Sequence, residues 1–150
     1  MRVFLAIIDE TEEAKLALRF AARRAADTDG SVHILALLPR QQFNAFGGVQ
    51  ATIEEEAHDR AEVLASAAAG ELFSESGKMP QIAVRAGEGV AVINEYLESH
   101  PEVAALVLGA AAEGNPGPLV THFSAHSGTL RCPLFIVPGG LGEERIDELS

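Results

Sequence analysis

Two stretches of the sequence hold residues that can bind a small ligand. Asp9 directly follows an apolar run and precedes Thr11, and a glycine-rich stretch, residues 109–118, begins as another apolar run ends. If both runs are strands of a parallel sheet, their carboxyl ends meet at one edge, which is where such sheets bind ligands. A glycine-rich loop that leads into a helix can present backbone N–H groups to a phosphate. The sequence therefore indicates either a phosphorylated ligand at this edge or a glycine/proline connector that binds nothing.

The glycine-rich stretch matches no standard phosphate-binding motif. Gly109 and Gly114 have the spacing of a P-loop, but Asn115 and Pro116 stand where a P-loop requires Lys and Ser or Thr. No G-x-G-x-x-G follows the first apolar run, so the dinucleotide fingerprint is missing too. The stretch holds Glu113 but neither Lys nor Arg, so an anionic ligand would depend on local donors.

Residues of other reactive types admit simpler interpretations. His122 and His126 are one helical turn apart, which suits a metal ion, but no third ligand accompanies them, so we expect a polar helix face and no metal site. An intermediate alternative is that His122 touches a phosphate or carboxylate at a helix N-terminus. Cys132 has no adjacent base to activate its thiol and is interpreted as structural. Phe43 and Phe46 either cover the ligand edge, pack at an interface or fold back on the next helix.

Apolar runs and amphipathic segments alternate along the chain. The predicted strands cover residues 3–8, 32–38, 81–84, 103–108 and 134–137. The predicted helices cover residues 12–27, 52–73, 90–99 and 119–127, and residues 40–51 are predicted to form a loop. Strands separated by helices form a parallel sheet with right-handed crossovers. The fold class is therefore α/β, a doubly wound five-stranded parallel sheet in one domain, with a helical turn expected in the tail.

Composition narrows the class of protein further. The 150 residues are 47% hydrophobic and 22% charged, as in a folded globular domain. The 22 acidic residues outnumber the 11 basic ones and give a net charge of -11, which disfavours nucleic acid and anionic membrane as partners. No window holds the roughly 18 consecutive apolar residues that a membrane-spanning helix needs. A single cysteine cannot form an internal disulfide, so a reducing, cytoplasmic setting is expected.

The order of motifs along nearly the whole chain resembles the universal stress proteins. The matching residues are Asp9-x-Thr11-Glu12 after the first strand, residues 106–109 (LVLG) and residues 132–138 (CPLFIVP). Residues 115–120 (NPGPLV) and 138–141 (PGGL) resemble a bacterial branch of that family. The resemblance implies a sheet of order 3-2-1-4-5 with helices on both faces. It also implies a family domain over residues 1–138, with residues 139–150 as a tail that docks on the domain or its partner.

The resemblance also implies which residues bind a nucleotide. In ATP-binding members, an aspartate after the first strand contacts the adenine or ribose, and a residue near the end of the second strand contacts the base. The family's phosphate loop, G-x2-G-x9-G-S/T, starts here at Gly109 but has Ala112 and Val120 where glycines are usual. The implied ligand is ATP or AMP, with no metal beyond the magnesium that accompanies a nucleotide. The predicted binding residues are Asp9, Leu37, Gly109, Ala112, Gly114, Thr121 and His122.

Three functions remain in competition on the sequence alone. The first is a regulatory, non-enzymatic module of the stress response that binds an adenine nucleotide. The second is a nucleotide-independent dimeric stress adaptor, which the altered loop favours. The third is a small nucleotide hydrolase, for which only Asp9 and Glu113 offer carboxylates near the phosphates. The uncharged strand from Leu134 to Val137 is an expected sheet edge, which is either covered by the tail or paired with a copy of itself. The family resemblance implies the pairing, so a homodimer is expected through this strand.

Overall fold

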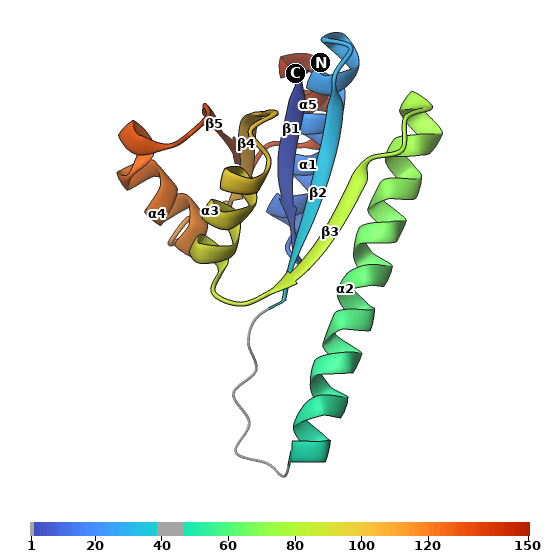
Figure 1. The fold of residues 1–150 in the computed structure, drawn as a ribbon. Helices are drawn as coiled ribbons and strands as arrows, with labels where there is room; N and C mark the ends of the chain where they lie inside the picture. The colour runs from blue at the N-terminus through green and yellow to red at the C-terminus, as the bar shows by residue number, and fades with distance from the viewer. Residues whose placement is uncertain (1, 39–46) are drawn as a thin grey trace.

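The computed structural model describes residues 2–38 and 47–150, with the backbone alone for residues 47–52. A parallel sheet of order β3-β2-β1-β4-β5 lies between two layers of helices (Figure 1). The strands are β1 (Val3–Ile8), β2 (Ser31–Leu38), β3 (Gln81–Ala86), β4 (Val103–Ala110) and β5 (Leu134–Pro138). The helices are α1 (Glu12–Asp27), α2 (Gly47–Ser76), α3 (Gly89–Ser99), α4 (Pro118–Ala125) and α5 (Glu143–Leu149). The predicted fold class and strand order are confirmed.

The central strand β1 is apolar at every position because helices cover both of its faces. Phe4, Ala6 and Ile8 pack into the core cluster that α1, α2 and α5 share. Val3 and Ile7 belong to the opposite cluster, which is formed with α3 and α4. A strand buried on both faces has no solvent side for polar residues, which explains the continuous run seen in the sequence. The first polar side chain after β1, Asp9, therefore emerges at the carboxyl edge of the sheet.

Helix α1 packs closely on the sheet. Its buried face consists mainly of alanines, which let its backbone approach the strands. The approach is tightest at Gly109 in β4, where an added Cβ would overlap the backbone carbonyl of Glu13. Gly109 is therefore required by helix packing, whether or not a phosphate approaches it. The buried residues of α1 are Ala14, Ala17, Leu18, Ala21 and Ala25.

Helix α2 is longer than the sequence pattern indicates. It begins at Gly47, five residues before the predicted start, and ends at Ser76. Glycine is tolerated at a helix start far better than in a helix interior, so Gly47 and Gly48 do not force a loop. The end comes where Gly77 adopts a φ of 75° and its N–H donates to the Phe73 carbonyl over 2.8 Å, a left-handed termination that favours glycine. Residues 43 and 46, the two loop phenylalanines, lie outside the described residues.

The tail folds back onto the first helix. Ile146 of α5 is buried in the core cluster beside α1. The Arg19 guanidinium donates to both carboxylate oxygens of Asp147, through Nε and Nη2, each over 2.7 Å. These hydrogen bonds lower the pKa of Asp147 and raise that of Arg19. Such a forked pair fixes the orientation of both side chains, so it holds α5 at one place along α1.

A buried polar pair lies inside the α3 face of the core. His33 of β2 is 6% exposed, and its Nδ1 is 2.9 Å from the Tyr96 hydroxyl oxygen. The Tyr96 ring stacks on His100 with centroids 3.9 Å apart. Burial is the main cause that lowers the pKa of His33, and the neighbouring His100 adds to it. His33 is therefore a neutral core residue at pH 7.

Candidate functional site

Asp9 is held in place by the turn that starts α1. Its Oδ1 accepts hydrogen bonds from the Thr11 backbone N–H over 2.8 Å and from the Thr11 hydroxyl over 2.5 Å. Thr11 in turn caps α1 by accepting from the Ala14 N–H over 3.3 Å. The second carboxylate oxygen of Asp9 accepts no hydrogen bond from the described residues. This exposed oxygen is free to accept from a ligand hydroxyl or amino group.

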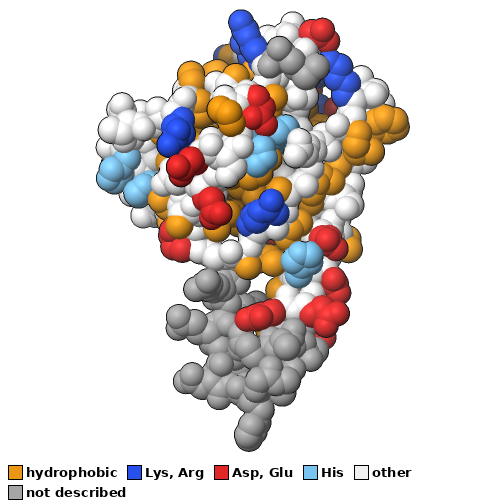
Figure 2. Space-filling model, viewed as in Figure 1, with side chains coloured by type: hydrophobic (Ala, Val, Ile, Leu, Met, Phe, Trp, Pro, Cys, Tyr) orange, Lys and Arg blue, Asp and Glu red, His pale blue; other side chains and the backbone are white. Residues whose placement is uncertain are grey.

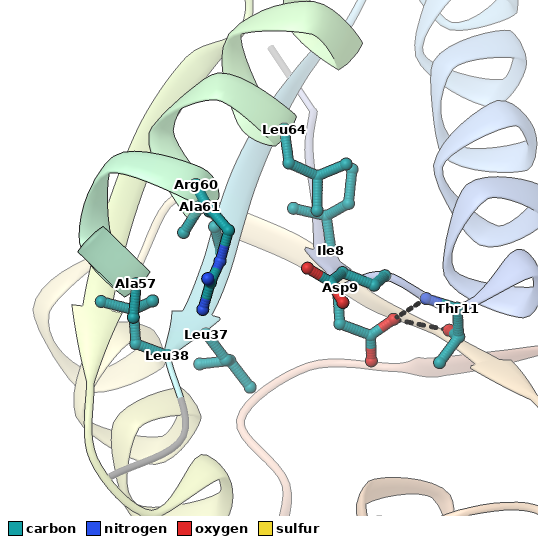
Figure 3. A pocket seen from close by; sticks show the side chains of 11 residues that line it. Ile8, Asp9, Thr11, Leu37, Leu38, Ala57, Arg60, Ala61 and Leu64 are labelled. Atoms are coloured by element: carbon teal, nitrogen blue, oxygen red, sulfur yellow. Dashed lines mark hydrogen bonds between the residues drawn. The ribbon is translucent and has the colours of Figure 1, made fainter. Parts of the chain in front are cut away.

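A cavity of about 320 Å³ opens beside Asp9, on the sheet face that α2 covers (Figure 3). Ligand pockets in proteins are usually about 300–1,000 Å³, so this one is large enough for a small ligand. Apolar side chains of β1, β2 and α2 form most of its wall, and Asp9 and Arg60 bring opposite charges to it. The lining residues are Ile8, Asp9, Glu10, Thr11, Ala36, Leu37, Leu38, Ala57, Arg60, Ala61 and Leu64.

Arg60 is the only basic residue that lines this cavity within the described part of the chain. Figure 3 shows its side chain extending from α2 towards the end of β2, with Asp9 across the opening. No ion pair joins the Arg60 guanidinium to another described residue. An exposed, unpaired guanidinium at the mouth of an apolar pocket can form two parallel hydrogen bonds with a phosphate or carboxylate.

A second, smaller hollow lies on the α4 side of the same edge. Its volume is about 150 Å³, and Asp9 and Thr11 line it together with Gly109 and residues 116–120. That volume is about half the lower end of the range usual for ligand pockets. Asp9 and Thr11 therefore stand between two hollows, and the larger one lies away from the glycine-rich loop.

The glycine-rich loop uses some of its own donors internally. The Gly117 N–H donates to the Asn115 Oδ1 over 2.8 Å, and the Ala111 N–H donates to the Pro116 carbonyl over 3.0 Å. The Thr121 hydroxyl donates to the Gly117 carbonyl over 2.9 Å. Pro116 and the next proline, at position 118, have no N–H to offer. The N–H groups of residues 112–115 donate to no acceptor among the described residues, so the loop is only partly closed on itself.

Two glycines of this loop serve its geometry. Gly114 and Gly117 have φ values of 70° and 118°, conformations that favour glycine. An added Cβ at either position would meet no atom within 4 Å. Their conformation, and not a neighbour, explains why glycine stands there.

The structure distributes the predicted binding residues over separate places. Asp9 and Leu37 line the 320 Å³ cavity together, and Gly109 lines the smaller hollow with Asp9. The other four predicted residues line neither of these two hollows, and their role in binding stays a prediction. They are Ala112, Gly114, Thr121 and His122.

His122 of α4 lies beside His126 and near Glu88, which caps α3. Its ring stacks on that of His126, with centroids 4.3 Å apart, and the His126 Nδ1 is 2.9 Å from the His122 carbonyl oxygen. Hydrogen bonds from the Ala91 and Val90 N–H groups lower the pKa of Glu88, and the charge of nearby His122 adds to this effect. The two histidines thus stack on each other at the end of α4, where the ring of one also contacts the backbone of the other.

Cys132 is half-buried against the core cluster of α3 and α4. Burial raises the pKa of its thiol. A thiol with a raised pKa is a poor nucleophile at neutral pH, which agrees with the structural role inferred from the sequence.

Arg60 is the site residue that sequence reasoning missed. A signal was present, because Arg60 stands directly before Ala61 and four residues before Leu64, which belong to an apolar stripe at helical spacing within residues 52–73. Positions beside such a stripe flank the buried face of a helix. The positive charge of the cavity comes from a helix that is distant in sequence from the glycine-rich loop.

Comparison with known proteins settles the family. The model of the universal stress protein family matches residues 1–138. The chain belongs to the universal stress protein family. No curated protein matches the sequence. None of the helices in the described residues of this family member combines the length and apolar character needed to span a membrane.

Solved structures of the family share the fold at low sequence identity. The universal stress protein UspA from Lactobacillus plantarum superposes with a TM-score of 0.77 at 16% identity, over 91% of this chain and 97% of that one. A universal stress protein from Archaeoglobus fulgidus gives 0.68 at 17% identity, over 91% and 93%. A universal stress protein in complex with cAMP gives 0.60 at 13% identity, over 91% and 96%.

Proposed function

We propose that this universal stress protein is a regulatory binding module that holds an adenine nucleotide at Asp9 and does not turn it over. The supporting observation is the free carboxylate oxygen of Asp9 at the rim of a 320 Å³ cavity with apolar walls. Such walls suit a purine ring, and a fixed carboxylate suits ribose hydroxyls or the adenine amino group. The family match and the relative crystallised with cAMP support the same ligand class.

The absence of turnover is part of the proposal. Hydrolysis of a phosphate needs a positioned base for water and a cation or metal at the phosphoryl group. Of the two acids that line the cavity, Asp9 has one oxygen engaged by Thr11, and Glu10 is exposed with no hydrogen bond from the described residues. This arrangement suits binding better than catalysis.

A nucleotide-independent dimeric adaptor is the second candidate function. The internal hydrogen bonds of the glycine-rich loop favour it, because they occupy donors that a nucleotide would need. In both candidates we propose a homodimer through β5, which has β4 as its only neighbour in the described sheet. Ile136 on this edge strand is 39% exposed and offers an apolar contact.

Titration calorimetry with AMP, ATP, cyclic AMP and adenosine tests the proposal. Asp9→Asn keeps the shape and an acceptor for Thr11 but removes the charge, and it should weaken binding about 10- to 100-fold, as expected for hydrogen bonds to a charged group. Asp27→Asn, at the exposed far end of α1, is the matched control and should leave affinity unchanged. No heat from any of the four ligands at millimolar concentration would leave the adaptor function standing. Steady release of phosphate from ATP, lost in Asp9→Asn, would contradict the absence of turnover.

A further inference from the structure

The glycine-rich loop offers no basic side chain to a chain of phosphates. Its Asn115 carboxamide and two of its own carbonyls take up the Gly117, Ala111 and Thr121 donors. The loop contributes Glu113 and no basic side chain, and Glu13 borders the smaller hollow beside it. A polyphosphate laid along this loop would meet negative charge and no basic side chain of the loop to compensate for it.

The opposite wall of the site supplies the missing positive charge. Arg60 and Asp9 line one cavity, and apolar residues such as Leu37 and Leu64 lie in the wall with them. A ligand that places its ribose at Asp9 can therefore extend its anionic end towards α2 within the same cavity (Figure 3). The Arg60 guanidinium has no competing carboxylate partner among the described residues.

We infer that Arg60 binds the anionic group of the ligand, in place of the loop, and that the site prefers adenosine with a single phosphate group to ATP. This inference rests on the proposed function and adds the residue that binds the phosphate. A phosphate monoester carries about -1.5 to -2 charges at pH 7, which one guanidinium matches through two parallel hydrogen bonds. ATP adds two further phosphates, for which the described lining of the cavity has no second basic residue.

Acidic residues around Arg60 strengthen the expected preference for one phosphate group over three. Figure 2 shows several acidic side chains gathered along α2. Exposed Glu55, Glu56, Asp59 and Glu62 flank Arg60 on this helix. Phosphates that reach past Arg60 would approach these carboxylates, so each additional phosphate lowers affinity instead of raising it.

Calorimetry on Arg60 variants of the full chain tests the inference. We expect wild-type protein to bind AMP about tenfold or more tightly than adenosine, and ATP no more tightly than AMP. Arg60→Gln should reduce AMP binding to the level of adenosine and leave adenosine itself unaffected. Arg60→Lys should retain part of the difference in affinity between AMP and adenosine, since lysine keeps the positive charge but cannot form the two parallel hydrogen bonds of a guanidinium. Arg24→Gln, near the other end of α1, is the matched control, and thermal melts confirm that each variant is folded.

The outcomes separate this inference from the proposed function. If ATP binds tenfold tighter than AMP, or Arg60→Gln leaves AMP affinity unchanged, the phosphate is held elsewhere and the role of Arg60 is overturned while nucleotide binding stands. If wild-type protein binds neither nucleotide nor adenosine, both fail. A gap between AMP and adenosine that narrows with added salt in wild type, and is absent in Arg60→Gln, supports a charge contact at this residue.

Discussion

The requirement for glycine at position 109 can be tested as a matter of packing alone. Gly109→Ala would place a Cβ on the Glu13 carbonyl of α1, and a backbone carbonyl cannot rotate away as a flexible side chain can. Forcing extra atoms into a packed contact costs about 1–3 kcal/mol, because the helix must shift off the sheet. For a chain of this length each kcal/mol lowers the melting temperature by about 2–4 °C, so a fall of about 2–12 °C is expected.

Two other glycines provide controls with different physical causes. Gly128→Ala adds a Cβ with no atom within 4 Å at a position without positive φ, so its melting temperature should stay close to wild type. Gly114→Ala is equally uncrowded but has a φ of 70°, which should cost about 1–2 kcal/mol through backbone strain. Thermal denaturation followed by circular dichroism, with no nucleotide present, ranks the three. A Gly109→Ala protein as stable as Gly128→Ala would refute the packing explanation and return Gly109 to a purely ligand-related role.

Two further predictions concern the core and the sheet edge. Because burial lowers the pKa of His33, the unfolded chain binds a proton there before the folded one does; stability should be fully present above about pH 6.5 and decline as pH falls below it. Urea unfolding at pH 7.5 and 5.5 checks this, and an equal decline in His33→Gln would exclude His33 as its source. Ile136→Lys puts a charge on the β5 edge and should convert a dimer to a monomer in sedimentation velocity, whereas Val63→Lys, at a more exposed apolar site on α2, should not. A wild-type protein that already sediments as a monomer would end the dimer proposal.

Most of the fold could be predicted from the sequence, because the hydrophobic patterns of its strands and helices are local and recur along the chain. The unbroken apolar run of β1 predicts a strand buried on both faces, and the alanine stripe of α1 predicts the helix that covers it. The order of the strands came from the family resemblance, since periodicity alone does not say which strands are neighbours. The start of α2 was predicted too late because Gly47 and Gly48 suggest a loop when their position at a helix end is unknown.

The candidate site could be predicted only in part, because strand topology places some of its residues and helix packing places the others. Asp9 and Leu37 end neighbouring strands, so topology alone brings them together. Arg60 reaches the same cavity from a helix far along the chain, and only packing places it there. The hydrogen bonds that close the glycine-rich loop, such as that between Gly117 and Asn115, depend on side-chain geometry that composition does not encode.

The turn at Asp9 makes the site observable by magnetic resonance. The Thr11 amide proton points at the Asp9 carboxylate, and the Ala14 amide proton points at the Thr11 hydroxyl oxygen. Protonation of Asp9, or binding of a ligand to it, should therefore shift the Thr11 amide proton and, through the Thr11 hydroxyl, the Ala14 amide proton. Each proton has its own resonance in an amide correlation spectrum. Those two resonances therefore report ligand binding in the cavity beside Asp9, and the ligand itself needs no label.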